Sequence, residues 1–124
     1  MSAFVVLYVE DDPVNAQLMQ SIAALRPGCE LRVAASGGQA RVAVQDERFD
    51  LLLCDQHLPD ADGSALLAEL RALGLTAPAL LVTAESADEA ERLAQQHGFD
   101  GCWTKPLDVH AVLREFERWQ ALRR

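Results

Sequence analysis

The sequence predicts an α/β protein in which helices cover both faces of a parallel β-sheet. Five short apolar segments, which are typical of buried strands, alternate with five segments whose apolar residues recur at helical spacing. The connections are short, as in βαβ units, and crossovers between parallel strands are right-handed. Of the 124 residues, 50% are hydrophobic, which is enough for the core of a single domain over residues 1–124.

The first strand is expected at residues 3–9, an apolar run rich in β-branched and aromatic side chains. In the acidic sequence that follows, Asp12 suits the N-cap of a helix and Pro13 its first position. The helix ends at Pro27-Gly28, and its apolar side chains at helical spacing are Val14, Leu18, Ile22 and Leu25.

The second strand is expected at residues 30–34, with a turn at Ser36-Gly37-Gly38. The helix after it is expected at residues 39–46, where the residues available for packing are Ala40, Ala43 and Val44.

The third strand, at residues 49–54, is an apolar run that ends abruptly at Asp55. A loop from Pro59 to Gly63 leads into a helix at residues 64–73, which Gly74 closes. The inward residues of this helix are expected to be Leu66, Leu67 and Leu70.

The fourth strand is expected at residues 78–82 and ends in Thr83-Ala84-Glu85. Ser86, with Glu89 three residues later, forms a capping box for a helix that runs to Gln96. The fifth strand, residues 101–104, precedes Lys105-Pro106. Asp108 then caps the last helix, which carries Val109, Val112, Leu113, Phe116 and Trp119.

Polar side chains follow four of the five strands at their C-terminal ends. The common arrangement at this size is a doubly wound, flavodoxin-like sheet with the order 2-1-3-4-5 and five helices. In it the C-terminal ends of all strands lie at one edge, where ligands bind in open α/β sheets. The residues expected there are Glu10, Asp11, Asp12, Asp55, Thr83 and Lys105.

Carboxylates this close together at one edge need compensation. At an effective dielectric constant of about 20, a pair of them about 4 Å apart costs on the order of 4 kcal/mol, more than Lys105 alone offsets. Either their pKa values rise or a divalent cation lies among them, and oxygen ligands favour Mg²⁺. A carboxylate, a hard cation, a lysine and a hydroxyl make a phosphoryl-transfer site, with Thr83 and the amide of Ala84 as hydrogen-bond donors.

Each of these residues also has a structural explanation. Thr83 can cap a helix through its hydroxyl, Lys105 can be a solvated lysine, and Asp11 and Asp12 can be caps. Joint placement at four strand ends is what favours the chemical explanation.

At these residues the chain resembles the receiver domains of response regulators in two-component systems. The residues that carry the resemblance are Val9-Glu10-Asp11-Asp12-Pro13, Asp55 with Pro59 and Gly63, Thr83-Ala84, and Lys105-Pro106. The resemblance implies that Asp55 accepts a phosphoryl group from a histidine kinase or a phosphotransfer protein, as in a phosphorelay.

The resemblance also implies a ligand set. Asp11 and Asp55 would bind Mg²⁺ directly with the backbone carbonyl of His57, and Glu10 would act through water. Thr83, the amide of Ala84 and Lys105 would hold the phosphoryl oxygens.

One position departs from the family. Receiver domains usually carry Tyr or Phe three residues before the lysine, and that ring moves inward on activation; here the residue is Cys102. Trp103 follows, but strand alternation directs it to the opposite face, where we expect it in the core. His57 and Glu85 flank the site at positions that tune water access in the family. Two roles are open for His57: a general base or an exposed loop residue.

Composition limits the class of partner. The formal net charge of −8 disfavours direct nucleic-acid binding, no apolar run approaches 18 residues, and no signal peptide is visible. The three cysteines are scattered and odd in number, which favours a cytoplasmic protein with reduced thiols.

No residues follow the last helix for an output domain, so the expected output is a protein contact. We expect it on the face formed by the helix after Ser86, the strand at residues 101–104 and the helix after Asp108. The chain also resembles receivers fused to hybrid sensor kinases, so a stand-alone protein and a part of such a kinase are both open.

Two other functions are alternatives to a non-enzymatic signalling module. A Mg²⁺-dependent phosphatase of the haloacid-dehalogenase type needs an Asp-x-Asp nucleophile on the first strand and a cap, whereas the isolated Asp55 follows the third strand. A receiver-like protein-binding domain that is never phosphorylated agrees with Cys102 but not with the complete set of acids, Thr83 and Lys105.

Overall fold

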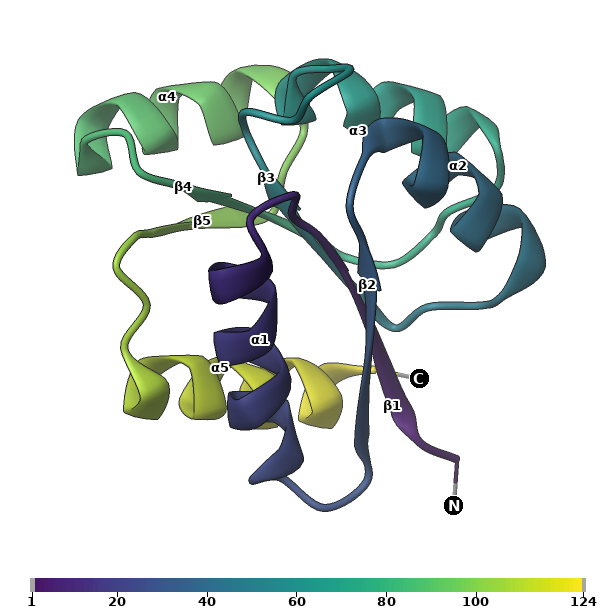
Figure 1. Ribbon diagram of the computed structural model, residues 1–124, viewed down its shortest axis with the longest axis vertical. Coiled ribbons are helices and arrows are strands. Elements are labelled where there is room, and N and C mark those ends of the chain that lie inside the picture. Colours follow the sequence, from purple (N-terminus) through teal and green to yellow (C-terminus); the bar gives the residue numbers. More distant parts are fainter. Residues whose placement is uncertain (1, 124) are drawn as a thin grey trace.

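The computed structural model describes residues 2–123 and forms a five-stranded parallel sheet between two layers of helices (Figure 1). The strand order is β2-β1-β3-β4-β5, as predicted. The strands are β1 (Phe4–Val9), β2 (Cys29–Ala34), β3 (Leu51–Asp55), β4 (Ala79–Thr83) and β5 (Gly101–Thr104). The helices are α1 (Pro13–Ala24), α2 (Gly37–Asp46), α3 (Gly63–Ala72), α4 (Ala87–His97) and α5 (Val109–Leu122). Within residues 2–123, none of these helices has the length and apolar character needed to cross a bilayer.

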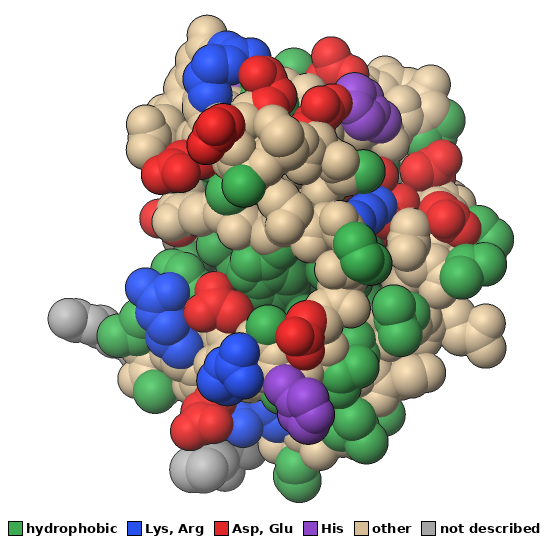
Figure 2. Space-filling view, turned by 90° about the vertical axis from the view of Figure 1, so that its left-hand side faces the viewer, with side chains coloured by type: hydrophobic (Ala, Val, Ile, Leu, Met, Phe, Trp, Pro, Cys, Tyr) green, Lys and Arg blue, Asp and Glu red, His purple; other side chains and the backbone are tan. Residues whose placement is uncertain are grey.

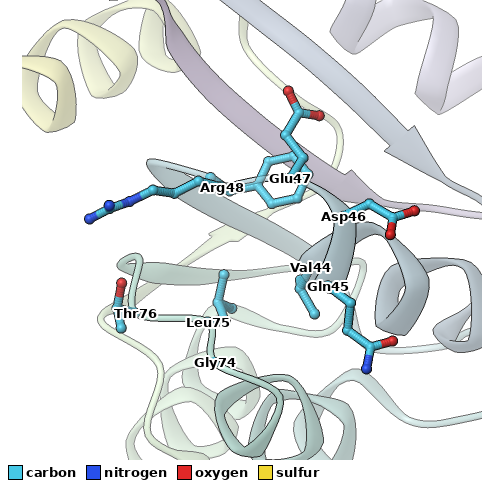
Figure 3. A pocket seen from close by; sticks show the side chains of 9 residues that line it. Val44, Gln45, Asp46, Glu47, Arg48, Gly74, Leu75 and Thr76 are labelled. Atoms are coloured by element: carbon cyan, nitrogen blue, oxygen red, sulfur yellow. The ribbon is translucent and has the colours of Figure 1, made fainter.

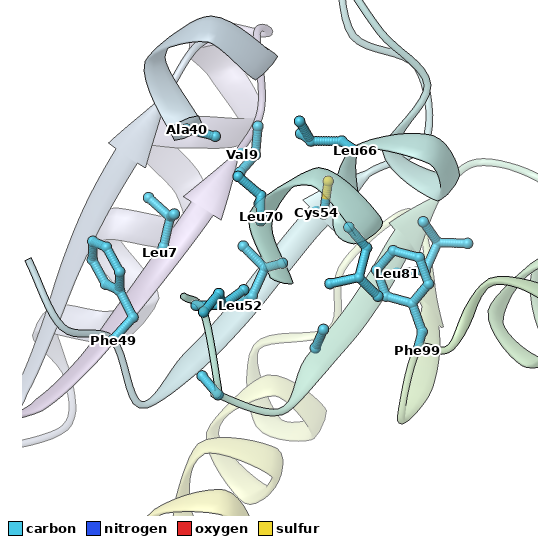
Figure 4. Close-up of a cluster of buried hydrophobic side chains, with 14 of the residues drawn as sticks. Leu7, Val9, Ala40, Phe49, Leu52, Cys54, Leu66, Leu70, Leu81 and Phe99 are labelled. Carbon is cyan, nitrogen blue, oxygen red and sulfur yellow. The ribbon is translucent and has the colours of Figure 1, made fainter. Parts of the chain in front are cut away.

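The sheet divides the interior into two cores. The α2–α4 core lies under α2, α3 and α4 and includes Leu7 and Val9 of β1 (Figure 4). The α1–α5 core lies on the other face and includes Phe4, Val6 and Tyr8 of the same strand. Alternate residues of β1 therefore serve opposite faces, as strand geometry requires.

The strands β3 and β4 are displaced by one or two residues from the predicted ranges. They begin at Leu51 and Ala79 and they include Asp55 and Thr83 as their last residues. Asp50, just before β3, instead holds the backbone of Val5: the two exchange hydrogen bonds of 2.8 and 2.9 Å. Asp55 and Thr83 are thus fixed by the hydrogen bonds of the sheet and do not lie in loops.

Helix α2 also begins earlier than predicted, at Gly37, where we expected a turn. The hydroxyl of Ser36 accepts a hydrogen bond from the backbone N–H of Gln39, so Ser36 is the N-cap and both glycines are helical. In α4 the predicted capping box forms only in part. Ser86 accepts from the N–H of Glu89, while the Glu89 carboxylate pairs with Arg92.

Of the four apolar residues at helical spacing that the sequence analysis noted in and after α1, only Ile22 is buried. Val14, Leu18 and Leu25 are 72%, 38% and 64% exposed, whereas the buried residues of the helix are Met19, Ile22 and Ala23. The helix carries two apolar stripes that share Ile22. Spacing alone did not distinguish the buried stripe from the exposed one.

The C-terminal end of α5 is tied to the beginning of β1. The guanidinium of Arg123 donates to the carbonyls of Ala3 (2.6 Å) and Ser2 (2.8 Å) and to the carboxylate of Asp50 (3.2 Å). It also lies over the ring of Phe4, 5.6 Å from the centroid. The two ends of the described chain therefore meet at the edge of the sheet where β1 begins.

Candidate functional site

Three carboxylates converge at the C-terminal edge of the sheet. Glu10 and Asp11 follow β1, Asp55 ends the neighbouring strand β3, and one oxygen of each lies within 4.8 Å of the others. Glu10 and Asp55 are buried (1% and 7% exposed), while Asp11 is exposed. Three of the six side chains that the sequence predicted to meet are therefore together.

Lys105 lies between two of these carboxylates. Its Nζ is 2.6 Å from Oε1 of Glu10 and 3.5 Å from Oδ2 of Asp55. The backbone N–H of Lys105 donates to the carbonyl of Thr83 (2.8 Å), which holds the residue at the end of β4. With a side chain only 15% exposed, Lys105 is not the solvated lysine of the structural alternative.

The pKa values of the two buried acids move in opposite directions. Burial, together with the charge of Glu10, raises the pKa of Asp55 to about 6. Burial also opposes ionisation of Glu10, but the hydrogen bond and charge of Lys105 outweigh it and lower the pKa of Glu10. The pKa of Lys105 is raised because its bonds to the same acids outweigh its own burial.

The donor set suits a hard divalent cation. With Asp55 ionised, three carboxylates face one ammonium group, which leaves an excess of negative charge among oxygen ligands. The segment that begins at Gln56 carries His57, which forms an isolated bridge with Asp62.

Thr83 is fully buried at the end of β4. Its hydroxyl accepts a hydrogen bond from the N–H of Glu85 (3.2 Å), and the N-cap of α4 is Ser86, so Thr83 does not cap that helix. Asp12, by contrast, is the N-cap of α1, where its carboxylate accepts from the N–H of Val14 (2.9 Å). Ala84 follows Thr83 in the turn before α4.

An exposed pair of side chains flanks the site. Nε2 of His57 lies 3.1 Å from Oε1 of Glu85, and the two side chains are 67% and 39% exposed. They join the segment after β3 to the segment after β4. The placement of His57 agrees with an exposed loop residue.

Cys102 and Trp103 point to opposite faces of β5, as predicted. Cys102 packs against the α2–α4 core and Trp103 against the α1–α5 core. The indole ring lies 6.2 Å from the ring of Phe116, and its Nε1 donates to Glu115 (3.2 Å). Trp103 is half-buried, and no aromatic ring occupies position 102.

Gly63 allows α3 to begin directly behind Asp55. A Cβ at this position would lie 2.2 Å from the carbonyl oxygen of Asp55, a distance that no side chain tolerates. The N–H of Gly63 donates to the carbonyl of Gln56 (2.8 Å), and Gln56 and Ser64 exchange two buried hydrogen bonds. These contacts fix the segment that leaves Asp55.

Sequence reasoning missed two contacts around the site. Tyr8, buried on β1, donates its hydroxyl proton to Glu10 (3.0 Å), and the alternation of β1 was a signal for this because the two residues share a face. The carboxylate of Asp60 accepts from the N–H groups of Gly37 (2.8 Å) and Gly38 (3.0 Å), which lowers its pKa. No local pattern in the sequence indicates this second contact.

A hollow of about 490 Å³ lies at the edge of the sheet opposite the carboxylate cluster (Figure 3). It is lined by residues 44–49 after α2 and 74–76 after α3, which face each other. The lining carries two acids, Asp46 and Glu47, and Glu47 is already paired with Arg32 at 3.1 Å. The candidate chemistry therefore belongs to the carboxylate cluster and not to this hollow.

Comparison with known proteins agrees with this geometry. Residues 6–117 match the family described as response regulator receiver domain. The chain is 38% identical over 114 residues to the transcriptional regulatory protein ZraR of Escherichia coli (strain K12), which covers 91% of this chain and 25% of ZraR. It is 31% identical over 108 residues to the sensor histidine kinase RcsC of the same strain, which covers 86% of this chain and 11% of RcsC.

Among solved structures, the fold is similar to the receiver domain of the sensor histidine kinase PA1611 from Pseudomonas aeruginosa PAO1, which has a magnesium ion coordinated in its active-site cleft. The TM-score is 0.84 at 27% identity, over 97% of this chain and 99% of that one. The chain spans a quarter or less of the length of the two curated relatives. Sheet order, sequence and structural similarity together show that the chain belongs to the response regulator receiver domains of two-component signalling.

Proposed function

We propose that the chain is a phosphoacceptor module in which Asp55 takes a phosphoryl group from a histidine kinase or a phosphotransfer protein in the presence of Mg²⁺. The observation that supports this most directly is the convergence of Glu10, Asp11, Asp55 and Lys105 at one edge of the sheet. The module would act as a switch for a protein-binding face and not as an enzyme with a separate substrate. We place it in the cytoplasm, where its three free thiols would stay reduced.

In the proposed transfer, an ionised oxygen of Asp55 attacks the phosphorus of a phosphohistidine. The P–O bond forms as the P–N bond breaks, and the electron pair of the broken bond stays on the imidazole nitrogen. Lys105 is bonded to Glu10 (2.6 Å), and its ammonium group, 3.5 Å from Asp55, would neutralise a phosphoryl oxygen on Asp55 after a short shift toward it. The Thr83 hydroxyl and the amide N–H of Ala84 are proposed as further donors to the same oxygens.

The chain's own oxygens would hold the cation. We assign Asp11, Asp55 and the backbone carbonyl of His57 as direct ligands and Glu10 as a ligand through water. When bound, Mg²⁺ supplies the positive charge that allows carboxylates and phosphoryl oxygens to lie together.

The test is direct. The protein is incubated with Mg²⁺ and acetyl phosphate, and intact mass is measured; a parallel sample receives beryllofluoride and is followed by NMR. We expect a mass gain of one phosphoryl group that Asp55→Asn abolishes and EDTA prevents. A wild-type chain that binds Mg²⁺ but gains no mass and shows no beryllofluoride response would contradict the proposal.

The kinase or phosphotransfer protein is proposed to dock beside the site on α1. The first turn of this helix begins two residues after Asp11, and it presents Val14 and Leu18 to solvent. Exposed apolar side chains on the helix that follows Asp11 can contact a partner that delivers the phosphohistidine to Asp55.

The output face is proposed to be α4, β5 and α5, which lies on the left of Figure 1 and faces the viewer in Figure 2. There, apolar side chains line a hollow between two bands of charged residues. A hollow of about 380 Å³ lies between β5 and α5 and is lined in part by Trp103, Leu107 and Val112. Since Cys102 replaces the usual aromatic residue, a change at the site would reach this face without a moving ring at position 102.

One observation favours a second candidate function, a protein-binding receiver that is never phosphorylated. That observation is Cys102, which lies on the α2–α4 side of β5 in place of an aromatic ring. The beryllofluoride experiment separates the two functions, because a domain of this second kind would show no response at Asp55.

A further inference from the structure

The hydroxyl of Tyr8 has a polar partner inside an otherwise apolar core. Tyr8 is fully buried among the residues of the α1–α5 core, and its hydroxyl lies 3.0 Å from Oε1 of Glu10. A phenylalanine ring would fill the same space, so packing does not require the hydroxyl. Its specific contribution is the hydrogen bond to Glu10, since buried tyrosine hydroxyls need a partner.

Glu10 receives donors on both of its oxygens. Oε1 accepts from Tyr8 and from Nζ of Lys105 (2.6 Å), while Oε2 accepts from the backbone N–H of Asp12 (3.3 Å). A carboxylate oxygen accepts about two hydrogen bonds, so Oε1 is filled and Oε2 retains capacity for a water bound to a cation. Tyr8 and Lys105 are therefore the two side-chain donors that hold Oε1.

Lys105 has a second carboxylate within reach. Its Nζ is 3.5 Å from Asp55, the proposed phosphoacceptor, and its closer bond is to Glu10. To neutralise a phosphoryl group on Asp55, the ammonium group must shift from Glu10 toward that group. The buried Oε1 would then lose its strongest donor, and an unpaired buried carboxylate oxygen is costly.

We propose that Tyr8 is a positioning residue that keeps Glu10 hydrogen-bonded while Lys105 moves from Glu10 to the phosphoryl group on Asp55. The inference rests on the proposed function. With Tyr8 in place, Oε1 keeps one donor throughout and Lys105 is free to shift. Without the hydroxyl, Lys105 remains the one side-chain donor to Oε1 and is retained there.

The test uses Tyr8→Phe in the full chain. Mg²⁺ affinity is measured by calorimetry, and beryllofluoride affinity is measured at saturating Mg²⁺. We expect Mg²⁺ affinity to change by less than about twofold and beryllofluoride affinity to fall by roughly three- to tenfold, the size expected for one hydrogen bond to a charged group. Urea unfolding of the metal-free variant checks that the fold is intact.

The matched control is Ser64→Ala, which also removes a buried hydroxyl near the site but one that bonds to Gln56 (3.1 Å) and not to Glu10. The backbone N–H groups of Ser64 and Gly63 still donate to Gln56 (2.9 and 2.8 Å) in this variant, so the segment after Asp55 stays fixed. We expect both affinities of this variant to stay within about twofold of the wild type. Three results for Tyr8→Phe would each overturn the inference. They are an equal loss of Mg²⁺ and beryllofluoride affinity, an unchanged beryllofluoride affinity, and an unfolded variant. A wild type that takes up no beryllofluoride fails the proposed function itself, and the inference falls with it.

Discussion

At the scale of single residues, the protonation of Asp55 makes the free energy of unfolding depend on pH. Its pKa is raised to about 6 in the folded chain, from 3.8 for an ordinary aspartate. Between these values the folded state binds the proton more tightly than the unfolded state does. The free energy of unfolding of the cation-free protein therefore falls as pH rises from about 4 to above 6, because ionising Asp55 opposes folding.

We expect Asp55→Asn to remove this loss. In EDTA at about pH 7.5 the variant should be more stable than the wild type by about 1–3 kcal/mol, and the difference should vanish near pH 4. Urea unfolding at a series of pH values measures it. Glu10 is present in both proteins, so its own opposite pH dependence largely cancels in the comparison. A difference that does not vary with pH would contradict the assignment.

Gly63 is the second residue whose identity the site requires. Because a Cβ would lie 2.2 Å from the carbonyl oxygen of Asp55, Gly63→Ala must displace either α3 or the end of β3. We expect the free energy of unfolding to fall by about 3 kcal/mol or more, at the upper end of overpacking costs. Chemical denaturation measures the change.

Gly38→Ala is the matched control for Gly63→Ala. Its Cβ would make an ordinary contact of 3.6 Å with the carboxylate of Asp60, and Gly38 already lies in a helix. We expect a stability that is unchanged or raised by up to about 1 kcal/mol, because alanine restricts the unfolded chain more than glycine does. Equal losses in the two variants would show that the approach to Asp55 is not the cause.

At the scale of elements, Asp60 joins the loop after β3 to the beginning of α2. Its two hydrogen bonds to Gly37 and Gly38 satisfy N–H groups that have no partner within the helix, and they place a negative charge at its N-terminus. We expect Asp60→Asn to speed amide hydrogen exchange at Gly37 and Gly38 while the strands stay protected. NMR-detected exchange measures this residue by residue.

The control for the Asp60 experiment is Asp62→Asn. Asp62 occupies the N-cap position of α3, but its side chain makes no capping hydrogen bond. Exchange in the first turn of α3 should therefore not change. Faster exchange across all five strands in Asp60→Asn would mean that the whole fold is loosened, and the assignment to one helix end would be wrong.

The exposed stripe of α1 leads to a prediction about partner choice. Val14 is 72% exposed, so Val14→Lys should leave the urea midpoint unchanged. If the phosphodonor protein docks on α1, the rate of transfer from a phosphotransfer protein should fall at least tenfold, while phosphorylation by acetyl phosphate should keep its rate. Val42→Lys on α2, where the native side chain is 57% exposed, is the control and should affect neither rate.

At the scale of the whole molecule, the alternation of apolar strand segments with helical segments predicted most of the fold. The five apolar runs and their short connections predicted a parallel sheet, and the strand order 2-1-3-4-5, which the structure confirms, was expected as the common arrangement at this size. The same topology brought Glu10, Asp55 and Lys105 together without any information about distance. A parallel sheet places all its C-terminal ends at one edge whatever the details of packing.

The features that the sequence did not predict depend on contacts between distant segments. The exposed stripe of α1 has the same spacing as the buried one, so the choice of face depended on α5 and the sheet. The bond from Asp60 to α2 spans 23 residues to Gly37, and no local pattern encodes it. The sequence predicted the direction of the pKa shifts only in part. Lys105 bonds more closely to Glu10 and lowers its pKa, so the pKa of Asp55 is the one that rises.

The Arg123 contacts have a consequence for larger architectures. Since this side chain bonds to the backbone of Ser2 and Ala3, both ends of the described chain, residues 2 and 123, lie where β1 begins, at the edge of the sheet opposite Asp55. Any polypeptide fused at either of these ends would therefore start away from the carboxylate cluster around Asp55. We expect such a fusion to leave that cluster open.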